Sequence, residues 1–371
     1  MRVGVPKEIK THEYRVGLTP EAAREYVAEG HEVLIETGAG AGIGAGDNAY
    51  TRVGATVVPT AEEVFAGADM IVKVKEPQNT EWARLREGQI LFTYLHLAPD
   101  PDQARGLIGS GCTAVAFETV TDARGGLPLL APMSEVAGRL AVEAAGAGLR
   151  RHAGGRGLLL GGVPGVHPAR VVVLGGGVVG THAARMAVGL GSDVVVLDRS
   201  IPRLRELDEL FGGRARTRFS TLGAVEDEIA AADVVIGAVL VPGATAPKLV
   251  RRDMLGGMKR GSVVVDVAID QGGCFETSRP TTHSEPTYEV DGVIHYCVAN
   301  MPGAVPLTSS QALNNATLPF GLALARSGIA TMLQNPHLRD GLNVHRGRIT
   351  HRAVANSLGL DHRPADEALS A

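Results

Sequence analysis

The segment VVVLGGGVVG, residues 171–180, decides the fold of this chain. Its first four residues predict a buried strand, and the residues after the glycines predict a helix that ends near Leu190. The next apolar run, VVVLD, ends at Asp198. A G-x-G-x-x-G turn alone is weak in a chain with 48 glycines. A strand before it, a helix after it and an acidic residue closing the next strand make it a dinucleotide-binding fingerprint.

Each part of this fingerprint has a physical task. Gly175 makes the tight turn, Gly177 lets the backbone approach a pyrophosphate, and Gly180 lets the helix pack closely on the strand. The phosphates then meet the helix N-terminus. Asp198 accepts hydrogen bonds from a ribose 2′-hydroxyl, which predicts NAD as cofactor, although the adjacent Arg199 is a residue type that serves the 2′-phosphate of NADP.

The rest of the chain repeats this alternation of strands and helices, which predicts doubly wound α/β domains with mostly parallel sheets. The runs that we expect as strands are 3–5, 33–35, 56–58, 70–74, 90–95, 113–117, 171–174, 194–197, 216–219, 234–240, 263–269 and 293–298. Thr19 and Pro20 are typical of a helix start and precede a helical pattern over 21–29. An Ala-rich pattern over 133–151 predicts a connecting helix.

After Pro306 we expect one long helix over 309–333 and no further strand. A tail without strands cannot form its own sheet, so we expect it to return to the first domain. The predicted organisation is a discontinuous substrate domain, 1–130 plus 307–371, with an NAD-binding Rossmann domain, 131–306, inserted into it and a cleft between the two.

Composition excludes several classes of protein. The net charge is −4 and no basic block stands out, so nucleic-acid binding is not expected. The three cysteines are far apart and in no C-x-x-C pattern, which predicts neither disulfides nor a zinc site. The N-terminus resembles no secretory signal. Prolines interrupt the uncharged stretch 292–325, so it predicts no membrane span. We expect a cytoplasmic protein without a membrane partner.

Three polar residues follow predicted strands of the first domain: Arg15 after the first, Lys75 after MIVKV and His96 after QILFTYL. Ligands bind outside the carboxyl ends of parallel strands. A guanidinium suits a substrate carboxylate, an ammonium polarises a carbonyl oxygen, and an imidazole moves protons. Each residue also has a simpler interpretation when it is considered alone. Arg15 could be a solvated cation in a loop, and Lys75 could form a pair with Lys73 on a polar strand face. His96 could be a structural histidine. Together they predict a site for an amino or hydroxy acid.

In the second domain, Asp270 follows the strand VVVDVAI. We expect it to be a second acid/base group, although a carboxylate that caps the turn at Gly272 and Gly273 is an equally good interpretation.

Longer strings are more specific than these patterns. The segments MRVGVPKEIKTHEYRVGLTP, IVKVKEP, LREGQILFTYLHLA, VLGGGVVG, VDVAIDQGGCFETSRPTTHSEPTY and YCVANMPGAVP resemble the alanine dehydrogenase family, collinearly up to about Asn335. The resemblance implies reversible, NAD-dependent oxidative deamination of L-alanine to pyruvate and ammonium in a homohexamer. It also implies that Arg15 and Lys75 bind substrate and that His96 and Asp270 are catalytic.

The resemblance further implies a set of cofactor contacts beyond the glycine turn: Ser134, Val178, Asp198, Arg203, Ser220, Val239, Leu240, Val267, Ala268, Ile269, Asp270, Arg279, Val298, Ala299, Asn300 and Met301. Some members of the family bind a divalent metal through a Glu and a His four residues apart. Ala323 and Ser327 occupy these positions here, so no metal is predicted.

Three other functions fit parts of the pattern. The soluble nucleotide-binding component of a proton-pumping transhydrogenase resembles the family in fold, but would need a membrane partner. A catalytically idle NAD-binding protein would not need polar residues at every strand end. A dehydrogenase of lysine-type amino acids is the third.

Overall fold

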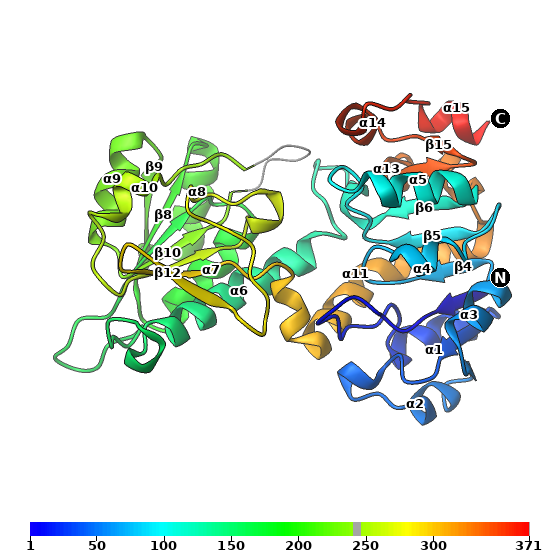
Figure 1. Cartoon of the computed structure of the whole chain (residues 1–371), viewed down its shortest axis with the longest axis horizontal. Helices are drawn as coiled ribbons and strands as arrows, with labels where there is room; N and C mark the ends of the chain where they lie inside the picture. Colours follow the sequence, from blue (N-terminus) through cyan, green and yellow to red (C-terminus); the bar gives the residue numbers. More distant parts are fainter. Residues whose placement is uncertain (240–245, 371) are drawn as a thin grey trace. The chain divides into compact units, whose positions relative to one another are not determined.

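In the computed structural model, which describes residues 1–239 and 246–370, the chain folds into two α/β units (Figure 1). Unit 1 consists of Met1–Met133 and Gly303–Ala371, and unit 2 of Ser134–Pro302. In Figure 1, unit 1 is blue, cyan, orange and red, and unit 2 is green to yellow. The helix α6, Ala131–Gly148, begins in unit 1 and continues into unit 2.

Unit 1 contains the strands β1 (Arg2–Val5), β2 (Glu32–Glu36), β3 (Thr56–Val58), β4 (Met70–Val72), β5 (Ile90–Thr93), β6 (Thr113–Ala116), β14 (Leu342–His345) and β15 (Arg348–Ile349). Its longer helices are α1 (Pro20–Ala28), α5 (Pro101–Ser110) and α11 (Pro306–Ser327). The shorter ones are α2 (Asp47–Thr51), α3 (Ala61–Gly67), α4 (Asn79–Trp82), α12 (Ala330–Gln334), α13 (Pro336–Asp340), α14 (Arg352–Leu358) and α15 (Ala365–Leu369), with 3₁₀ turns η1 (Ala41–Ile43) and η2 (Phe117–Thr119).

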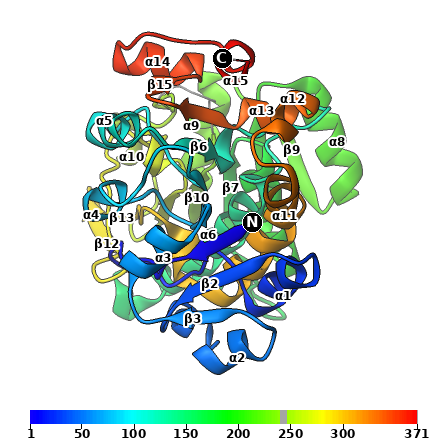
Figure 2. The same ribbon diagram turned by 90° about the vertical axis from the view of Figure 1, so that its right-hand side faces the viewer.

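The described strands of unit 1 form one sheet in the order β15-β14-β6-β5-β4-β1-β2-β3. The six from β6 to β3 are parallel, as predicted, and β14 and β15 are antiparallel. Figure 2 shows α14 and α15 beside the β15 edge and α2 beside the β3 edge. The strand order reverses between β4 and β1, which is where open α/β sheets bind their ligands.

The expectation of a tail without strands was wrong. The tail adds β14 and β15 to the edge of the sheet beyond β6, where β14 pairs with β6. The sequence LNVH of β14 carries no apolar run, because two of its four buried residues are polar. Asn343 donates to Thr119 Oγ1 at 2.7 Å, and His345 Nδ1 lies 2.9 Å from Thr113 Oγ1. Hydrogen bonds to other segments, which periodicity cannot reveal, make this burial possible.

The single helix expected over 309–333 was also wrong. The structure has α11 up to Ser327 and then α12, with Gly328 at φ +57 between them. Glycine reaches positive φ without a steric penalty, so it ends the helix here. The helix over 21–29 is confirmed as α1, with Pro20 in its first turn and the Thr19 side chain accepting a hydrogen bond from Ala22 N–H.

Unit 2 contains β7 (Arg170–Leu174), β8 (Asp193–Asp198), β9 (Ala215–Phe219), β10 (Val234–Gly237), β11 (Val263–Asp266), β12 (Thr287–Val290) and β13 (Val293–Tyr296). Its other helices are α7 (Val178–Gly189), α8 (Ile201–Phe211), α9 (Leu222–Ala231) and α10 (Arg252–Leu255), with 3₁₀ turns η3 (Arg151–Ala153), η4 (Ile269–Gln271) and η5 (Met301–Ala304), the last of which ends in unit 1. The sheet order is β12-β13-β11-β10-β7-β8-β9 over the described strands, all parallel except β12.

Alternate residues of the valine-rich strands of unit 2 face opposite sides of the sheet. Val171 and Val173 pack with the alanines of α6 and α7, whereas Val172 and Leu174 pack with α9 and α10. Burial on both sides explains why these strands have continuous apolar runs. The edge strand β12 was not predicted; its burial alternates, and it joins β13 through Asp291 and Gly292, both at positive φ.

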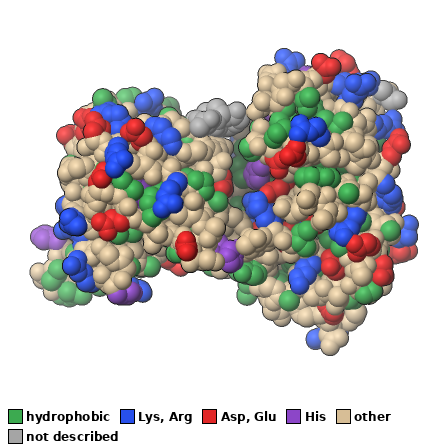
Figure 3. Space-filling model, viewed as in Figure 1, with side chains coloured by type: hydrophobic (Ala, Val, Ile, Leu, Met, Phe, Trp, Pro, Cys, Tyr) green, Lys and Arg blue, Asp and Glu red, His purple; other side chains and the backbone are tan. Residues whose placement is uncertain are grey.

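Lys and Arg side chains are interspersed with Asp and Glu on the face of each unit that Figure 3 shows. Across the described ranges, no helix has the length and apolar character that crossing a membrane requires.

Candidate functional site

Arg15, Lys75 and His96 lie in the loops that follow β1, β4 and β5 of unit 1. These are neighbouring parallel strands at the switch point, so all three loops leave the same edge of the sheet. β4 and β5 end at Val72 and Thr93, earlier than predicted. Lys75 and His96 therefore lie in loops, where the backbone is not held by strand pairing.

Arg15 is almost fully buried, with 2% of its surface exposed. Its Nε donates to Glu13 Oε1 at 2.7 Å, and Nη2 donates to Glu13 Oε2. Its Nη1 lies 3.0 Å from Met133 Sδ. Burial opposes the charged form, but the hydrogen bonds and charge of Glu13 outweigh it and raise the pKa of Arg15. Arg15 is a fixed, oriented cation and not the solvated loop residue of the alternative interpretation.

Lys75 and Lys73 have different environments, so they are not a pair on one polar face. Lys73 is buried between Glu8, 3.1 Å from its Nζ, and Glu81, 2.8 Å away. Lys75 Nζ lies 3.9 Å from Glu76 Oε2, and 12% of its side chain is exposed. Glu8 also accepts a hydrogen bond from Val74 N–H at 2.7 Å, so the buried ion pairs anchor the loop that carries Lys75.

His96 has φ +47, a conformation that non-glycine residues seldom adopt. Its ring stacks on that of Tyr94, with centroids 5.6 Å apart and planes within 4°. Its side chain is 45% exposed, which does not fit a buried structural histidine. Backbone strain of this kind clusters at functional sites.

Lys75 and His96 share one charged neighbour, Glu76, and Arg15 has Tyr94 as a neighbour. Burial favours the neutral form of Glu76, but the charges of Lys75, Lys10 and His96 lower the pKa of this carboxyl. Lys75 and His96 therefore both lie near Glu76. Tyr94, which stacks on His96, also acts on the pKa of Arg15. The structure thus brings together the three residues that the sequence proposed for unit 1.

The glycine turn of unit 2 has the geometry of the fingerprint. Gly175 has φ +101. A Cβ on Gly180 would lie 1.8 Å from Gly175 O, so only glycine allows this contact between helix and turn. Gly177 is exposed, and a Cβ there would meet nothing within 4 Å. It precedes α7, whose N-terminus has no side-chain cap.

Asp198 and Arg203 hold this turn from the side of β8 and α8. Asp198 accepts hydrogen bonds from Gly176 N–H at 2.7 Å and Ser200 N–H at 2.8 Å. Arg203 Nε donates to Gly176 O at 2.7 Å. An open, uncapped helix N-terminus with an acidic residue beside it fits the pyrophosphate and ribose of a dinucleotide.

The other predicted cofactor residues lie mainly at the carboxyl ends of the strands of unit 2. Ser220 follows β9, and its N–H donates to Asp198 O at 2.9 Å. Val239 follows β10, and Leu240 lies outside the described residues. Val267, Ala268, Ile269 and Asp270 follow β11, and Val298, Ala299, Asn300 and Met301 follow β13. Arg279 lies over the ring of Tyr288, 4.2 Å from its centroid, and Ser134 is on α6.

Asp270 is exposed in η4, four residues beyond the end of β11. Sequence reasoning missed the residue that holds its loop, Asp266. The Asp266 Oδ2 atom accepts hydrogen bonds from Cys274 N–H at 2.8 Å and Ser278 Oγ at 2.5 Å. Burial raises the pKa of Asp266. The aspartate within VVVDVAI was the available signal, because a charge inside an apolar run needs a specific partner.

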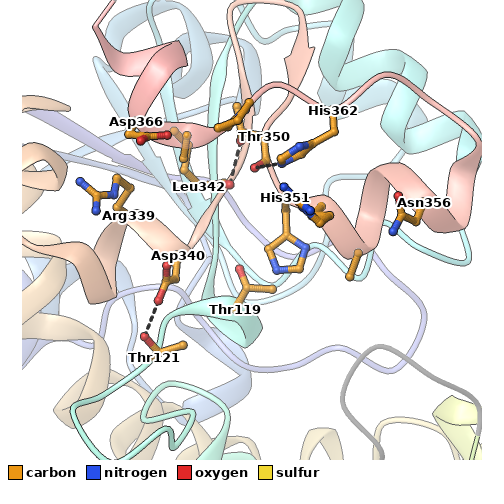
Figure 4. Close-up of a pocket in the computed structure, with 14 residues that line it drawn as sticks. Thr119, Thr121, Arg339, Asp340, Leu342, Thr350, His351, Asn356, His362 and Asp366 are labelled. Atoms are coloured by element: carbon orange, nitrogen blue, oxygen red, sulfur yellow. Dashed lines mark hydrogen bonds between the residues drawn. The ribbon is translucent and has the colours of Figure 1, made fainter.

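A cavity of about 670 Å³ lies on another part of unit 1 (Figure 4). Its lining comes from η2, α13, β14, α14 and α15, and includes His351, Asp340 and Arg339. His351 Nδ1 is buried with no hydrogen-bond partner among the described residues. None of the predicted site residues lines this cavity, so we do not place the chemistry there.

A dinucleotide turn on one Rossmann-type sheet, together with a buried arginine, a lysine and a strained histidine on a second α/β unit, defines a nicotinamide-dinucleotide-dependent oxidoreductase. Comparison with known families gives the assignment. Residues 4–137 match the alanine dehydrogenase/PNT N-terminal domain, and residues 141–352 match the alanine dehydrogenase/PNT C-terminal domain. The chain belongs to the alanine dehydrogenase/PNT family.

Individual relatives agree with this assignment. The chain is 60% identical to an alanine dehydrogenase of Halomonas elongata, over 98% of each chain, and 54% identical to one of Mycobacterium tuberculosis, over 97% of each. A solved L-alanine dehydrogenase superposes with a TM-score of 0.94 at 52% identity, covering 97% of this chain and 99% of that one. A transhydrogenase from Sinorhizobium meliloti has a TM-score of 0.81 at 28% identity, covering 95% and 100%.

Proposed function

We propose that this chain is an L-alanine dehydrogenase: alanine, water and NAD⁺ give pyruvate, ammonium, NADH and a proton, reversibly. The observation that carries the proposal is the left-handed His96 on the same sheet edge as Arg15 and Lys75, near the switch point of unit 1. The relatives support it, because the alanine dehydrogenases compared share 48–60% identity over 97–100% of the chain, whereas the transhydrogenase shares 28% over 95%.

The proposed cofactor is NAD. Asp198 lies beside the glycine turn, where a carboxylate accepts hydrogen bonds from a ribose 2′-hydroxyl and repels a 2′-phosphate. When bound, the nicotinamide supplies the redox chemistry by accepting hydride from the substrate Cα. The open N-terminus of α7 is proposed to bind the pyrophosphate.

Arg15 is proposed to bind the carboxylate of alanine. Glu13 takes the edge of the guanidinium formed by Nε and Nη2 and so holds the cation in one orientation. Lys75 is proposed to hold the oxygen that becomes the carbonyl of pyruvate. Arg15, which Glu13 holds in place, and Lys75, beside Glu76, would together orient a small zwitterion whose methyl group makes few contacts.

His96 and Asp270 are proposed to manage the protons. After hydride leaves Cα the substrate is an iminium ion, and water must lose a proton as it adds to that carbon. One of the two groups accepts this proton, and His96 then passes a proton to the nitrogen. The added hydroxyl gives its proton to the deprotonated group as the C=O bond forms and the C–N bond breaks, which releases ammonia. The partial exposure of His96 allows the exchange of protons with solvent.

We further propose, from the family resemblance, that the protein is a cytoplasmic homohexamer without a membrane partner. We propose that the substrate domain predicted from the sequence, 1–130 plus 307–371, binds alanine, and that the predicted domain 131–306 binds NAD.

Steady-state formation of NADH across a panel of amino acids tests the proposed activity. We expect turnover with L-alanine and little with lysine-type substrates. An enzyme that fails to oxidise alanine but exchanges hydride between two nucleotides would contradict the proposal and favour the transhydrogenase alternative.

A further inference from the structure

Glu118, in η2 directly after β6, is bonded to the loop that carries His96. Its Oε1 accepts a hydrogen bond from His96 N–H at 2.6 Å. The N–H of Leu95 lies 3.2 Å from Oε2 and 3.3 Å from Oε1. One carboxylate thus binds two successive backbone amides. Because these bonds are charge-assisted, they are stronger than bonds to neutral acceptors.

The residue held in this way has the strained backbone. The backbone of His96 has φ +47, in the left-handed region, which is unfavourable for any residue with a Cβ atom. Such a conformation persists only where the surroundings impose it. The bond to His96 N–H fixes the backbone from one side, and the stack with Tyr94 fixes the ring.

Glu118 has a second contact with the same residue. Its Oε1 is 3.8 Å from His96 Nδ1, and only 14% of the Glu118 side chain is exposed. Within the described part of the chain, no Lys or Arg forms an ion pair with this carboxylate, whereas Glu13, Glu76 and Glu81 each have a cationic partner. The hydrogen bonds to the Glu118 carboxylate among the described residues come from the His96 loop, and the same carboxylate also acts electrostatically on His351.

We infer that Glu118 is a positioning residue, which holds His96 in the left-handed backbone conformation and orients its imidazole for proton transfer. The inference rests on the proposed function, because it gives Glu118 a role through His96. Glu118 itself does not have to touch the substrate. Its loss should impair the proton-transfer steps and leave the cation pair Arg15 and Lys75, which bind the substrate, in place.

Three variants test this role. Glu118→Leu removes both acceptors at similar volume, and Glu118→Gln keeps one oxygen that can accept from His96 N–H. Asp122→Ala is the matched control: Asp122 Oδ1 accepts from the N–H groups of Arg124 and Gly126, both at 2.8 Å, in a turn without site residues. For each variant we would measure kcat and KM for alanine, NADH affinity by fluorescence, and the urea midpoint of unfolding.

We expect Glu118→Leu to lower kcat by about 10²-fold, the scale on which misplacement of a catalytic group acts. KM for alanine and NADH affinity should stay near the wild-type values. Glu118→Gln should recover a large part of kcat. Asp122→Ala should lower the urea midpoint without lowering kcat. In a His96→Ala background, Glu118→Leu should cause little further loss, because both changes remove one function.

Several results would overturn the inference. One is a Glu118→Leu enzyme with the wild-type kcat. Another is a fall of kcat in Asp122→Ala as large as that in Glu118→Leu. A third is a fall of kcat on Glu118→Leu that is as large in the His96→Ala background as in the wild type. If Glu118→Leu does not fold, the kcat of Glu118→Gln is compared with that of the wild type and of Asp122→Ala in the same way. Failure of the proposed function looks different, because the wild-type protein itself would then not oxidise alanine and no kcat values could be compared. In that case a crystal structure of Glu118→Gln or Glu118→Leu with His96 still at positive φ would refute the positioning role.

Discussion

The carboxylate of Asp198 accepts a hydrogen bond from the backbone N–H of Gly176 at 2.7 Å. The residue proposed to select the cofactor therefore also holds the glycine turn that would bind it. A second bond, from Ser200 N–H, ties the same side chain to the start of α8. Substitutions of Asp198 should consequently change both the choice of cofactor and the affinity for it.

We expect the wild-type enzyme to prefer NAD strongly, and Asp198→Gly or Asp198→Ser to narrow the gap. Removal of the carboxylate ends its repulsion of a 2′-phosphate, which Arg199 can then meet. The loss of the bond to Gly176 should also weaken NAD binding, by about tenfold if it is worth 1–1.5 kcal/mol. Values of kcat/KM for both cofactors test this. A wild type that used NAD and NADP equally would refute the role of Asp198.

Gly180→Ala should abolish or severely weaken NADH binding, because the new Cβ would lie 1.8 Å from Gly175 O and would displace the turn. Gly189→Ala, in the same helix, is the control, since a Cβ there meets nothing within 4 Å. Fluorescence titration with NADH compares the two. Equal affinities in both variants would contradict the tight contact between α7 and the turn.

His96→Ala should reduce alanine turnover by about 10²–10⁴-fold, the range for one acid/base group. Arg15→Ala and Lys75→Ala should also remove activity, through loss of substrate binding and orientation. All three residues belong to unit 1, so NADH affinity should remain near the wild-type value. Asp270→Asn is expected to affect both alanine turnover and NADH affinity. A His96→Ala enzyme that retained most of its activity would show that the site is wrongly assigned.

Lys73→Met should destabilise the protein by about 3–5 kcal/mol, because it leaves two buried carboxylates without their cation. Burial raises the pKa of Glu8 even with Lys73 present. Lys7→Met, at an exposed lysine of the same unit, should change stability little. Urea unfolding of the two variants measures the difference. Similar midpoints would show that the Lys73 ion pairs add no net stability.

Light scattering should give a mass near six times 38.6 kDa. This expectation comes from the family resemblance. A stable, active monomer at low micromolar concentration would contradict it.

The sequence by itself determined the α/β class, most parallel strands and the glycine turn. Each of these has a local signal: an apolar run, a helical period, or glycines at fixed spacing. It also placed Arg15, Lys75 and His96 on one edge, because the carboxyl ends of parallel strands coincide. It overestimated the length of β4, β5 and β11, because apolar residues such as Val74 and Leu95 continue into buried loops beyond the last residue of the strand.

Only the tertiary structure decided features that depend on residues far apart in the sequence. The hairpin β14–β15 joins β6 across more than two hundred residues, and its polar side chains are buried because distant partners bond to them. Lys73 and Lys75 look alike in sequence, but Glu8 and Glu81 make one a buried anchor and leave the other beside the site. Glu118 acquires its proposed role in the same way, since strand pairing between β5 and β6 brings its carboxylate to the amide of His96.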